Sequence, residues 1–166
     1  HRLPLAVPLN VHEVLERVVA LIASEHREAV KLIRDYDPSL PPLSADPDQL
    51  MQALLNITRN AVQSIAQDGH VIFRTRALTN FPIGAIRHKL VLSIEIEDNG
   101  PGVPADLAES IFYPLVTGRP DGTGLGLPIS QDLVSRHGGL IEYQSRPGKT
   151  VFSVRLPAVA PAPDPA

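Results

Sequence analysis

The chain has 166 residues, a hydrophobic fraction of 43% and a formal net charge of -3. This length suits one domain with an aliphatic core, because aromatic residues make up only 4% of the chain. The slight negative charge argues against a broad nucleic-acid-binding surface, and the absence of cysteine excludes disulfides and thiolate metal sites.

No apolar run reaches membrane-spanning length, and no signal peptide is recognisable. We therefore expect a cytoplasmic protein that binds neither a membrane nor nucleic acid. The chain starts at His1 rather than at methionine, so we expect it to be part of a longer protein.

The first part of the chain predicts a helix, a strand and a loop. Apolar residues recur at helical spacing over 10–26, where Asn10 stands in the N-cap position. Residues 29–36 suit a short strand. Residues 37–47 are punctuated by prolines and predict a loop.

A second helix is signalled more strongly than any other element. Asp46 is its N-cap, Pro47 its first residue and Gln49 the second partner of a capping box. We expect the helix to run to a C-terminal cap at Gly69. Its core-facing stripe consists of Leu50, Leu54, Ile57, Ala61 and Ile65.

The rest of the chain predicts strands around a third helix. The expected strands are 71–78, 89–98, 140–145 and 150–156. Residues 79–88 suit a hairpin-like loop, and residues 113–124 a mobile loop. A helix over 126–137 would end at the glycine pair 138–139.

The order of these elements predicts an α/β fold (an α+β sandwich) with a mixed, mostly antiparallel sheet and helices on one face. Regular β-α-β alternation is missing, which argues against a parallel sheet. We expect one domain over residues 1–157, followed by a disordered proline- and alanine-rich tail over 158–166.

Three glycines, Gly122, Gly124 and Gly126, stand within five residues at the start of the third helix. Glycine loses much backbone freedom on folding, so the cluster favours close backbone approach to a phosphate. A flexible loop is the alternative. The phosphate-loop and dinucleotide-binding spacings do not fit, and "GKT" at 148–150 suits a hairpin turn.

Asn56 and Asn60 stand four residues apart and share one face of the second helix. Asparagine is a poor interior helix residue, so the pair favours function over polar surface filling. Its carboxamide oxygen is a suitable ligand for Mg²⁺.

Asp98 ends a strand, and Gly100 and Gly102 follow it. The carboxylate could accept a hydrogen bond from an exocyclic amine. By itself the stretch "DNGPG" fits an Asn-Gly turn with a capping aspartate better.

Taken in order, the asparagine pair, "DNGPG", "IFYPLVTGRPDGTGLGL" and "PGKTVFSVRLP" resemble the N, G1, F, G2 and G3 boxes of the GHKL (Bergerat) ATP-binding fold. This fold is the catalytic domain of two-component histidine kinases. Stretches 8–18, 34–64 and 122–139 are more narrowly similar to nitrogen-regulation sensor kinases.

The resemblance implies a site for ATP and Mg²⁺. Asn60 would coordinate Mg²⁺, and Asn56 would support the metal and the phosphates, which makes them the catalytic pair. Asp98 would bind the adenine amino group, with Thr150 joining it through a water.

The resemblance also implies roles for the glycines. Gly100 and Gly102 would let the chain pass under the base, and residues 113–121 would form the ATP lid. The backbone N–H groups that would face the phosphates belong to Gly122, Thr123, Gly124, Leu125 and Gly126.

The sequence departs from the family pattern at two positions. Gln63 stands where many such kinases carry a lysine or arginine, so Arg59 or Arg119 would neutralise phosphate charge. Asn56 stands where related ATPases carry a glutamate that activates water. A neutral amide cannot act as a general base, which favours phosphoryl transfer over hydrolysis.

The resemblance therefore implies a kinase domain that donates the γ-phosphoryl group to a histidine on a dimerisation domain outside this chain. No histidine here lies in the acceptor context H-E-x-x-N-P. An NtrC-type response regulator and a PII-type signal protein are the further partners implied. The alternatives are an ATPase that hydrolyses ATP itself and a non-catalytic regulatory module.

Overall fold

The computed structural model describes residues 2–25, 30–65, 68–102 and 126–158. The helices are α1 (Val11–Glu25), α2 (Pro47–Gln63) and α3 (Gly126–Arg136). The main sheet contains β2 (Val30–Asp35), β4 (Gly69–Ile83), β5 (Ile86–Asp98), β6 (Leu140–Arg146) and β7 (Lys149–Pro157), and a second sheet pairs β1 (Val7–Leu9) with β3 (Leu43–Ala45).

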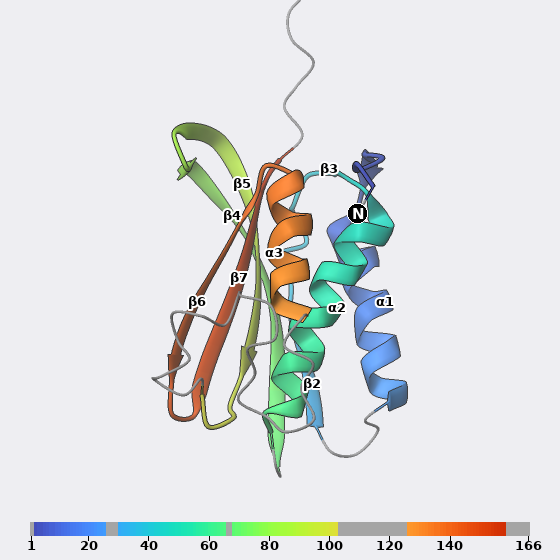
Figure 1. Ribbon diagram of the computed structural model, residues 1–166, viewed down its shortest axis with the longest axis vertical. Coiled ribbons are helices and arrows are strands. Elements are labelled where there is room, and N and C mark those ends of the chain that lie inside the picture. Colours follow the sequence, from blue (N-terminus) through green and yellow to red (C-terminus); the bar gives the residue numbers. More distant parts are fainter. Residues whose placement is uncertain (1, 26–29, 66–67, 103–125, 159–166) are drawn as a thin grey trace, which may run out of the picture.

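The main sheet has the strand order β2-β4-β5-β7-β6, and all three helices cover one of its faces (Figure 1). Only β2 and β4 pair in parallel, and the other neighbours are antiparallel. The expected α/β sandwich, with a mixed, mostly antiparallel sheet and helices on one face, is confirmed.

The core lies between the sheet and the helices. Alternate residues of β5 and β7 face it, which follows from the twofold side-chain period of a strand. The fully buried strand residues include Leu92, Ile94, Ile96, Val154 and Leu156. The α2 stripe meets them with Leu54 and Ile57, so the predicted core face of this helix is confirmed.

The loop predicted over 37–47 is wrong at its end, because Leu43–Ala45 forms β3. This strand pairs antiparallel with β1, where Val7 lies opposite Ala45. Leu43 and Ala45 are buried. The partner strand lies far away in the sequence, so local proline content could not reveal the pairing.

The C-terminal cap predicted at Gly69 is also wrong. Helix α2 ends at Gln63, and Ser64 is its C-cap. Gly69 begins β4, and a Cβ there would lie 1.9 Å from Ile65 Cγ2. The glycine therefore permits a close approach between β4 and the chain leaving α2.

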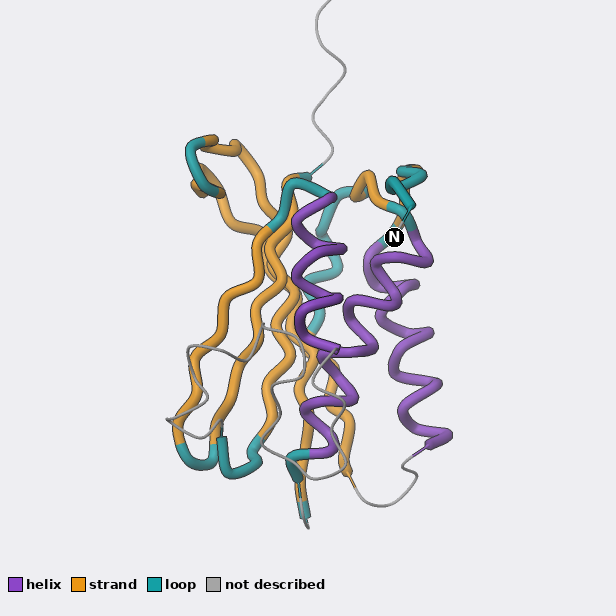
Figure 2. Tube along the Cα trace, viewed as in Figure 1, coloured by secondary structure: helices purple, strands orange, loops and turns teal. Residues whose placement is uncertain are grey.

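The loop predicted over 79–88 is mostly strand. β4 and β5 pair as far as Ile83 and Ile86, and only Gly84 and Ala85 form the turn. Gly84 has φ +60°, a conformation that favours glycine. Figure 2 shows the far half of this hairpin reaching beyond the other strands.

Strand pairing also continues at the end of the described chain. The Ala158 N–H donates to the Leu90 carbonyl at 3.0 Å, one residue past the predicted domain end. Residues 159–166, where a disordered tail is predicted, lie outside the described residues. Among the residues that the structure describes, no helix is long and apolar enough to cross a membrane.

Asp46 joins the N-terminal segment to two helices. Its carboxylate caps α2, as predicted, and also accepts from the Leu5 N–H at 2.9 Å and from the Arg2 guanidinium. Gln49 does not close a capping box, because its amide donates to the Arg2 carbonyl at 2.8 Å. The Asp46 N–H donates to His137 Nε2, which lies just beyond α3.

Asp46 makes the free energy of unfolding depend on pH. The hydrogen bond from Arg2 holds the pKa of this carboxyl well below its ordinary range. A carboxyl whose pKa is lower in the folded state stabilises the fold above its unfolded-state pKa, and that stability is lost as pH falls through the folded-state value. Asp46→Asn is therefore expected to reduce the free energy of unfolding by about 1 kcal/mol at neutral pH, with the difference shrinking in acid.

Urea denaturation at about pH 7 and about pH 3 measures this difference. Asp48→Asn is the matched control, because Asp48 is exposed in the first turn of the same helix. A difference between wild type and Asp46→Asn that stays constant with pH would contradict the assignment.

Candidate functional site

Asp98 and Thr150 lie side by side at one end of the sheet. They are directly opposite each other in the β5–β7 register, and both face the helices. Each is 3% exposed. A buried carboxylate beside a buried hydroxyl is costly unless both find hydrogen-bond partners.

Two groups bond to one oxygen of Asp98. Oδ1 accepts from the Gly100 N–H at 2.9 Å and from Ser64 Oγ at 3.3 Å. Thr150 Oγ1 lies 2.8 Å from Ser145 Oγ across the β6–β7 pair. A row of hydroxyl groups therefore brackets the carboxylate from α2 to β6.

Gly100 and Gly102 allow the turn after β5 to pack closely on its neighbours. A Cβ at Gly100 would lie 2.7 Å from Ser64 Oγ. Gly102 has φ +91°, and a Cβ there would lie 2.9 Å from Ser145 Oγ. The glycines thus have a packing reason within the fold, in addition to the contact with a base that the resemblance implies.

Asn56 and Asn60 lie on α2, and both are partly buried. Asn56 Nδ2 is 3.4 Å from the Gly126 carbonyl, so the structure brings Asn56 to the start of α3, and Asn60 follows one turn later on α2. Ser130 of α3 also donates to the Ala53 carbonyl at 2.8 Å, which holds the two helices together. Among the described neighbours, Gly126 has space for a Cβ, with Asn56 Cβ at 3.7 Å.

Arg59 is paired with an acidic side chain of another helix in this structure. Its guanidinium forms an ion pair with Glu25 of α1, with Nη2 2.6 Å from Oε1. A phosphate-neutralising role for Arg59 would require this exposed ion pair to open. Such a pair contributes little stability, so opening it is inexpensive.

Several predicted site residues lie outside the described part of the chain. These are Arg119, Gly122, Thr123, Gly124 and Leu125, together with the predicted lid over 113–121. Their roles stay predictions.

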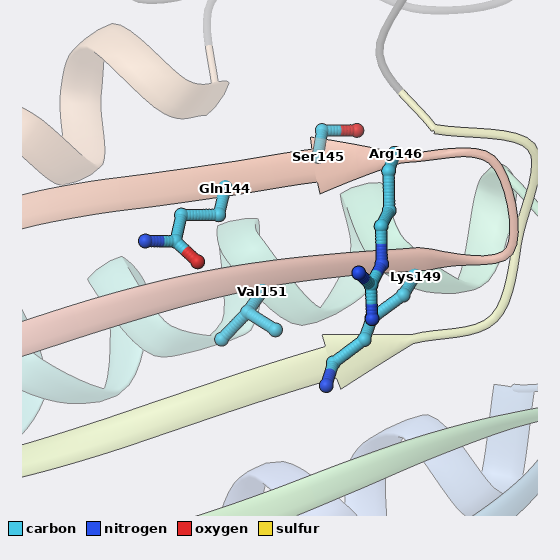
Figure 3. Close-up of a pocket in the computed structure, with 5 residues that line it drawn as sticks. All are labelled: Gln144, Ser145, Arg146, Lys149 and Val151. Carbon is cyan, nitrogen blue, oxygen red and sulfur yellow. The ribbon is translucent and has the colours of Figure 1, made fainter.

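A shallow pocket of about 160 Å³ lies elsewhere, at the β6–β7 turn. Figure 3 shows Gln144, Val151, Arg146 and Lys149 on the near side of the strands, with the helices behind them. Thr150 belongs to the opposite alternation of β7 and faces the helices. Apart from Ser145, which lies at the edge of the sheet and contacts Thr150, the side chains that line this pocket are therefore on the other face of the sheet from Asp98.

Sequence reasoning missed Ser64 and Ser145. Ser64 reaches Asp98 from the end of α2, and Ser145 reaches Thr150 from the adjacent strand. The β6–β7 register could have indicated Ser145, because a tight turn after Arg146 places it opposite Thr150. No local signal marks Ser64, since its contact depends on how the helix packs on the sheet.

Curated relatives share sequence with most of the chain. It is 50% identical over 149 residues to "Sensory histidine kinase/phosphatase NtrB" of Klebsiella oxytoca and 51% identical to that of Escherichia coli O157:H7, in each case over 89% of this chain and 43% of the relative. The NtrB of Rhodobacter capsulatus is 42% identical, over 96% of this chain and 46% of the relative. The chain thus spans less than half the length of these relatives.

Solved structures of histidine kinases share the fold. The nucleotide-free catalytic domain of histidine kinase ThkA superposes with a TM-score of 0.78 at 24% identity, covering 92% of this chain and 95% of that one. Full-length ShkA, solved in complex with AMPPNP, gives a TM-score of 0.78 at 29% identity over 98% of this chain and 33% of that one. The family described as "Histidine kinase-, DNA gyrase B-, and HSP90-like ATPase" matches residues 45–160. These matches and the sandwich fold show that the chain belongs to this ATPase family.

Proposed function

We propose that this chain is the catalytic domain of an NtrB-type sensor histidine kinase. It binds Mg²⁺-ATP and transfers the γ-phosphoryl group to a histidine on a dimerisation domain outside the chain. Membership of the ATPase family supports ATP as the nucleotide, and the names of the relatives support the kinase activity.

The observation that carries the proposal is the buried Asp98 carboxylate beside Thr150, at the same end of the fold as the end of α2. An ionised carboxylate only accepts hydrogen bonds, so it selects an amino group over a carbonyl. Adenine carries an exocyclic amino group where guanine carries a carbonyl. Asp98 therefore provides a physical basis for selecting ATP over GTP.

The asparagine pair suits Mg²⁺ that arrives with the nucleotide. Within the described ranges, no three His, Cys, Asp or Glu side chains are grouped closely enough to hold a metal ion. Mg²⁺ commonly binds through a few protein oxygens together with substrate phosphates and water, and the Asn60 carboxamide fits such a set. When bound, Mg²⁺ would neutralise phosphate charge, while Asn56 supports the phosphates one turn earlier.

Transfer to a protein fits this site better than hydrolysis. In transfer, the bond between the γ-phosphorus and the bridging oxygen breaks, a phosphorus–nitrogen bond forms and ADP leaves. The protein contributes positioning and charge neutralisation. Hydrolysis needs a base for water, and the neutral amide of Asn56 cannot serve as one.

Two described histidines have structural partners rather than an acceptor setting. His12 Nε2 lies 2.8 Å from Thr75 Oγ1, and its ring stacks on Tyr36. His137 contacts the Leu133 carbonyl through Nδ1 and the Asp46 N–H through Nε2. These contacts argue against His12 and His137 as the phosphate acceptor.

Incubation with γ-labelled ATP tests the proposal. With Mg²⁺, the chain alone should bind ATP, hydrolyse it slowly and gain no acid-labile, base-stable label. A separately added dimerisation domain should become labelled on histidine, because docking brings the acceptor imidazole in line with the γ-phosphate.

The same experiment separates the alternatives. Rapid steady-state turnover without a partner would indicate an ATPase, and no ATP binding would indicate a non-catalytic module. Strong labelling of this chain alone would contradict the proposed division of labour. We further propose an NtrC-type response regulator and a PII-type signal protein as partners of the whole kinase, on the basis of the sequence resemblance to nitrogen-regulation sensor kinases.

A further inference from the structure

Ser64, the C-cap residue of α2, lies against the carboxylate of Asp98. Ser64 Oγ is 3.3 Å from Asp98 Oδ1 and 2.7 Å from the Ala61 carbonyl. The same Oδ1 accepts from the Gly100 N–H at 2.9 Å. One carboxylate oxygen is thus engaged both from the end of a helix and from its own turn.

Gly100 indicates that Ser64 is packed in place. A Cβ at position 100 would lie 2.7 Å from Ser64 Oγ and 3.0 Å from Asp98 Oδ1. The Ser64 hydroxyl, the turn at Gly100 and the Asp98 carboxylate therefore fill one small volume. A side chain at position 100 would displace either the hydroxyl or the carboxylate. The single hydroxyl proton of Ser64 donates mainly to the Ala61 carbonyl at 2.7 Å, and Asp98 Oδ1 at 3.3 Å is a longer, second acceptor.

We propose that Ser64 is a positioning residue that orients the Asp98 carboxylate toward the exocyclic amino group of adenine. This role rests on the ATP site proposed above. The terminal torsion of an aspartate is broad and roughly twofold, so packing alone sets the carboxylate plane poorly. The Gly100 N–H holds one oxygen at 2.9 Å, and the longer Ser64 contact at 3.3 Å limits rotation of the carboxylate about that bond. Hydrogen bonds weaken steeply when misaligned, so this limit matters for a base that binds the carboxylate.

The positioning role of Ser64 predicts an effect on nucleotide binding that a merely stabilising role would not produce. Ser64 affects binding only of nucleotides that carry an amino group for Asp98 to accept from. Purine riboside triphosphate, which carries hydrogen in place of that amino group, should be insensitive to Ser64.

Titration of ATP and of purine riboside triphosphate into wild type and Ser64→Ala tests this role. The Kd for ATP should rise roughly three- to tenfold in Ser64→Ala, which is the effect of a misaligned hydrogen bond to a charged group. The Kd for purine riboside triphosphate should stay within about twofold. Ser64→Thr keeps the hydroxyl and should restore most of the ATP affinity.

Ser24→Ala is the matched control. Ser24 Oγ donates to the Leu21 carbonyl at 2.7 Å, the same local bond that Ser64 makes to Ala61, but in α1. Thermal unfolding of this variant measures the loss of such a bond alone, and its affinity for ATP should equal that of wild type.

Unchanged ATP affinity in Ser64→Ala, or equal weakening of both nucleotides, would overturn the positioning role. Failure of Ser64→Thr to recover affinity while it folds normally would overturn it as well. A wild-type chain that binds neither nucleotide would overturn the ATP site itself, and with it the role of Ser64.

Discussion

Asn60→Asp is expected to lower labelling of an added dimerisation domain from γ-labelled ATP by roughly 100-fold or more. Asn60 lies on α2 one turn after Asn56, which contacts the start of α3. The substitution keeps the shape of the side chain but adds a negative charge where Mg²⁺ and the phosphates would lie. The charge opposes the phosphates directly and changes the coordination of the metal.

Initial rates of transfer, measured with ATP at saturation and with excess Mg²⁺, check this expectation. Asn80→Asp is the control, because it makes the same change from amide to acid at an exposed position in the β4–β5 hairpin. The control should transfer at the wild-type rate. Normal transfer by Asn60→Asp would remove Asn60 from the metal site.

Asp98→Asn is expected to weaken ATP binding by about 10- to 100-fold, or about 1.5–3 kcal/mol. The carboxylate is buried, and an amide accepts more weakly and can turn its NH₂ group toward the base. For the same reason, discrimination against GTP should relax, since an NH₂ group can donate to the guanine carbonyl.

Equilibrium titration of both nucleotides measures the two effects. Glu97→Gln is the matched control, because Glu97 directly precedes Asp98 in β5. Its side chain faces the opposite side of the sheet, where it pairs with Arg74. The control removes the same charge and should leave the affinity for ATP unchanged. An Asp98→Asn variant that binds ATP normally would remove Asp98 from the base site.

Asp98 shows which parts of the candidate site could be predicted from sequence motifs. Position in the sequence placed it at the end of a strand, and the structure confirms that strand. The family resemblance also placed Thr150 with it, and the structure sets the two opposite each other in strand register. Ser64 could not be predicted, because it reaches Asp98 only through the packing of a distant helix on the sheet.

Arg59 is a different case, because its ion-pair partner lies far away in the sequence and could not be predicted from neighbouring residues. Gln63 stands where the family carries a basic residue, which suggested Arg59 as a phosphate contact, and the structure pairs Arg59 with Glu25 of another helix. The phosphate role stays a prediction. A long, exposed side chain selects its partner from whatever the fold brings within reach, so its sequence neighbours are a weak guide.

Features of the fold that depend on neighbouring residues could be predicted from the amino-acid pattern. Asp46 caps α2, the stripe from Leu50 to Ala61 is buried, and the alternation of Leu92, Ile94 and Ile96 faces the core. Caps, helical stripes and strand alternation arise from backbone geometry over a few residues, so they can be predicted locally.

Other features of the fold depend on contacts between distant segments. The β1–β3 pair, the long β4–β5 hairpin and the end of α2 at Gln63 each differ from the local prediction. Leu43 becomes a strand residue because β1 supplies its hydrogen bonds, and Gly69 joins β4 because it pairs with β2. Only glycine fits there, because Ile65 occupies the space of a side chain. These outcomes depend on which distant segment lies alongside, and that is settled by burial of the whole core rather than by propensity at any one position.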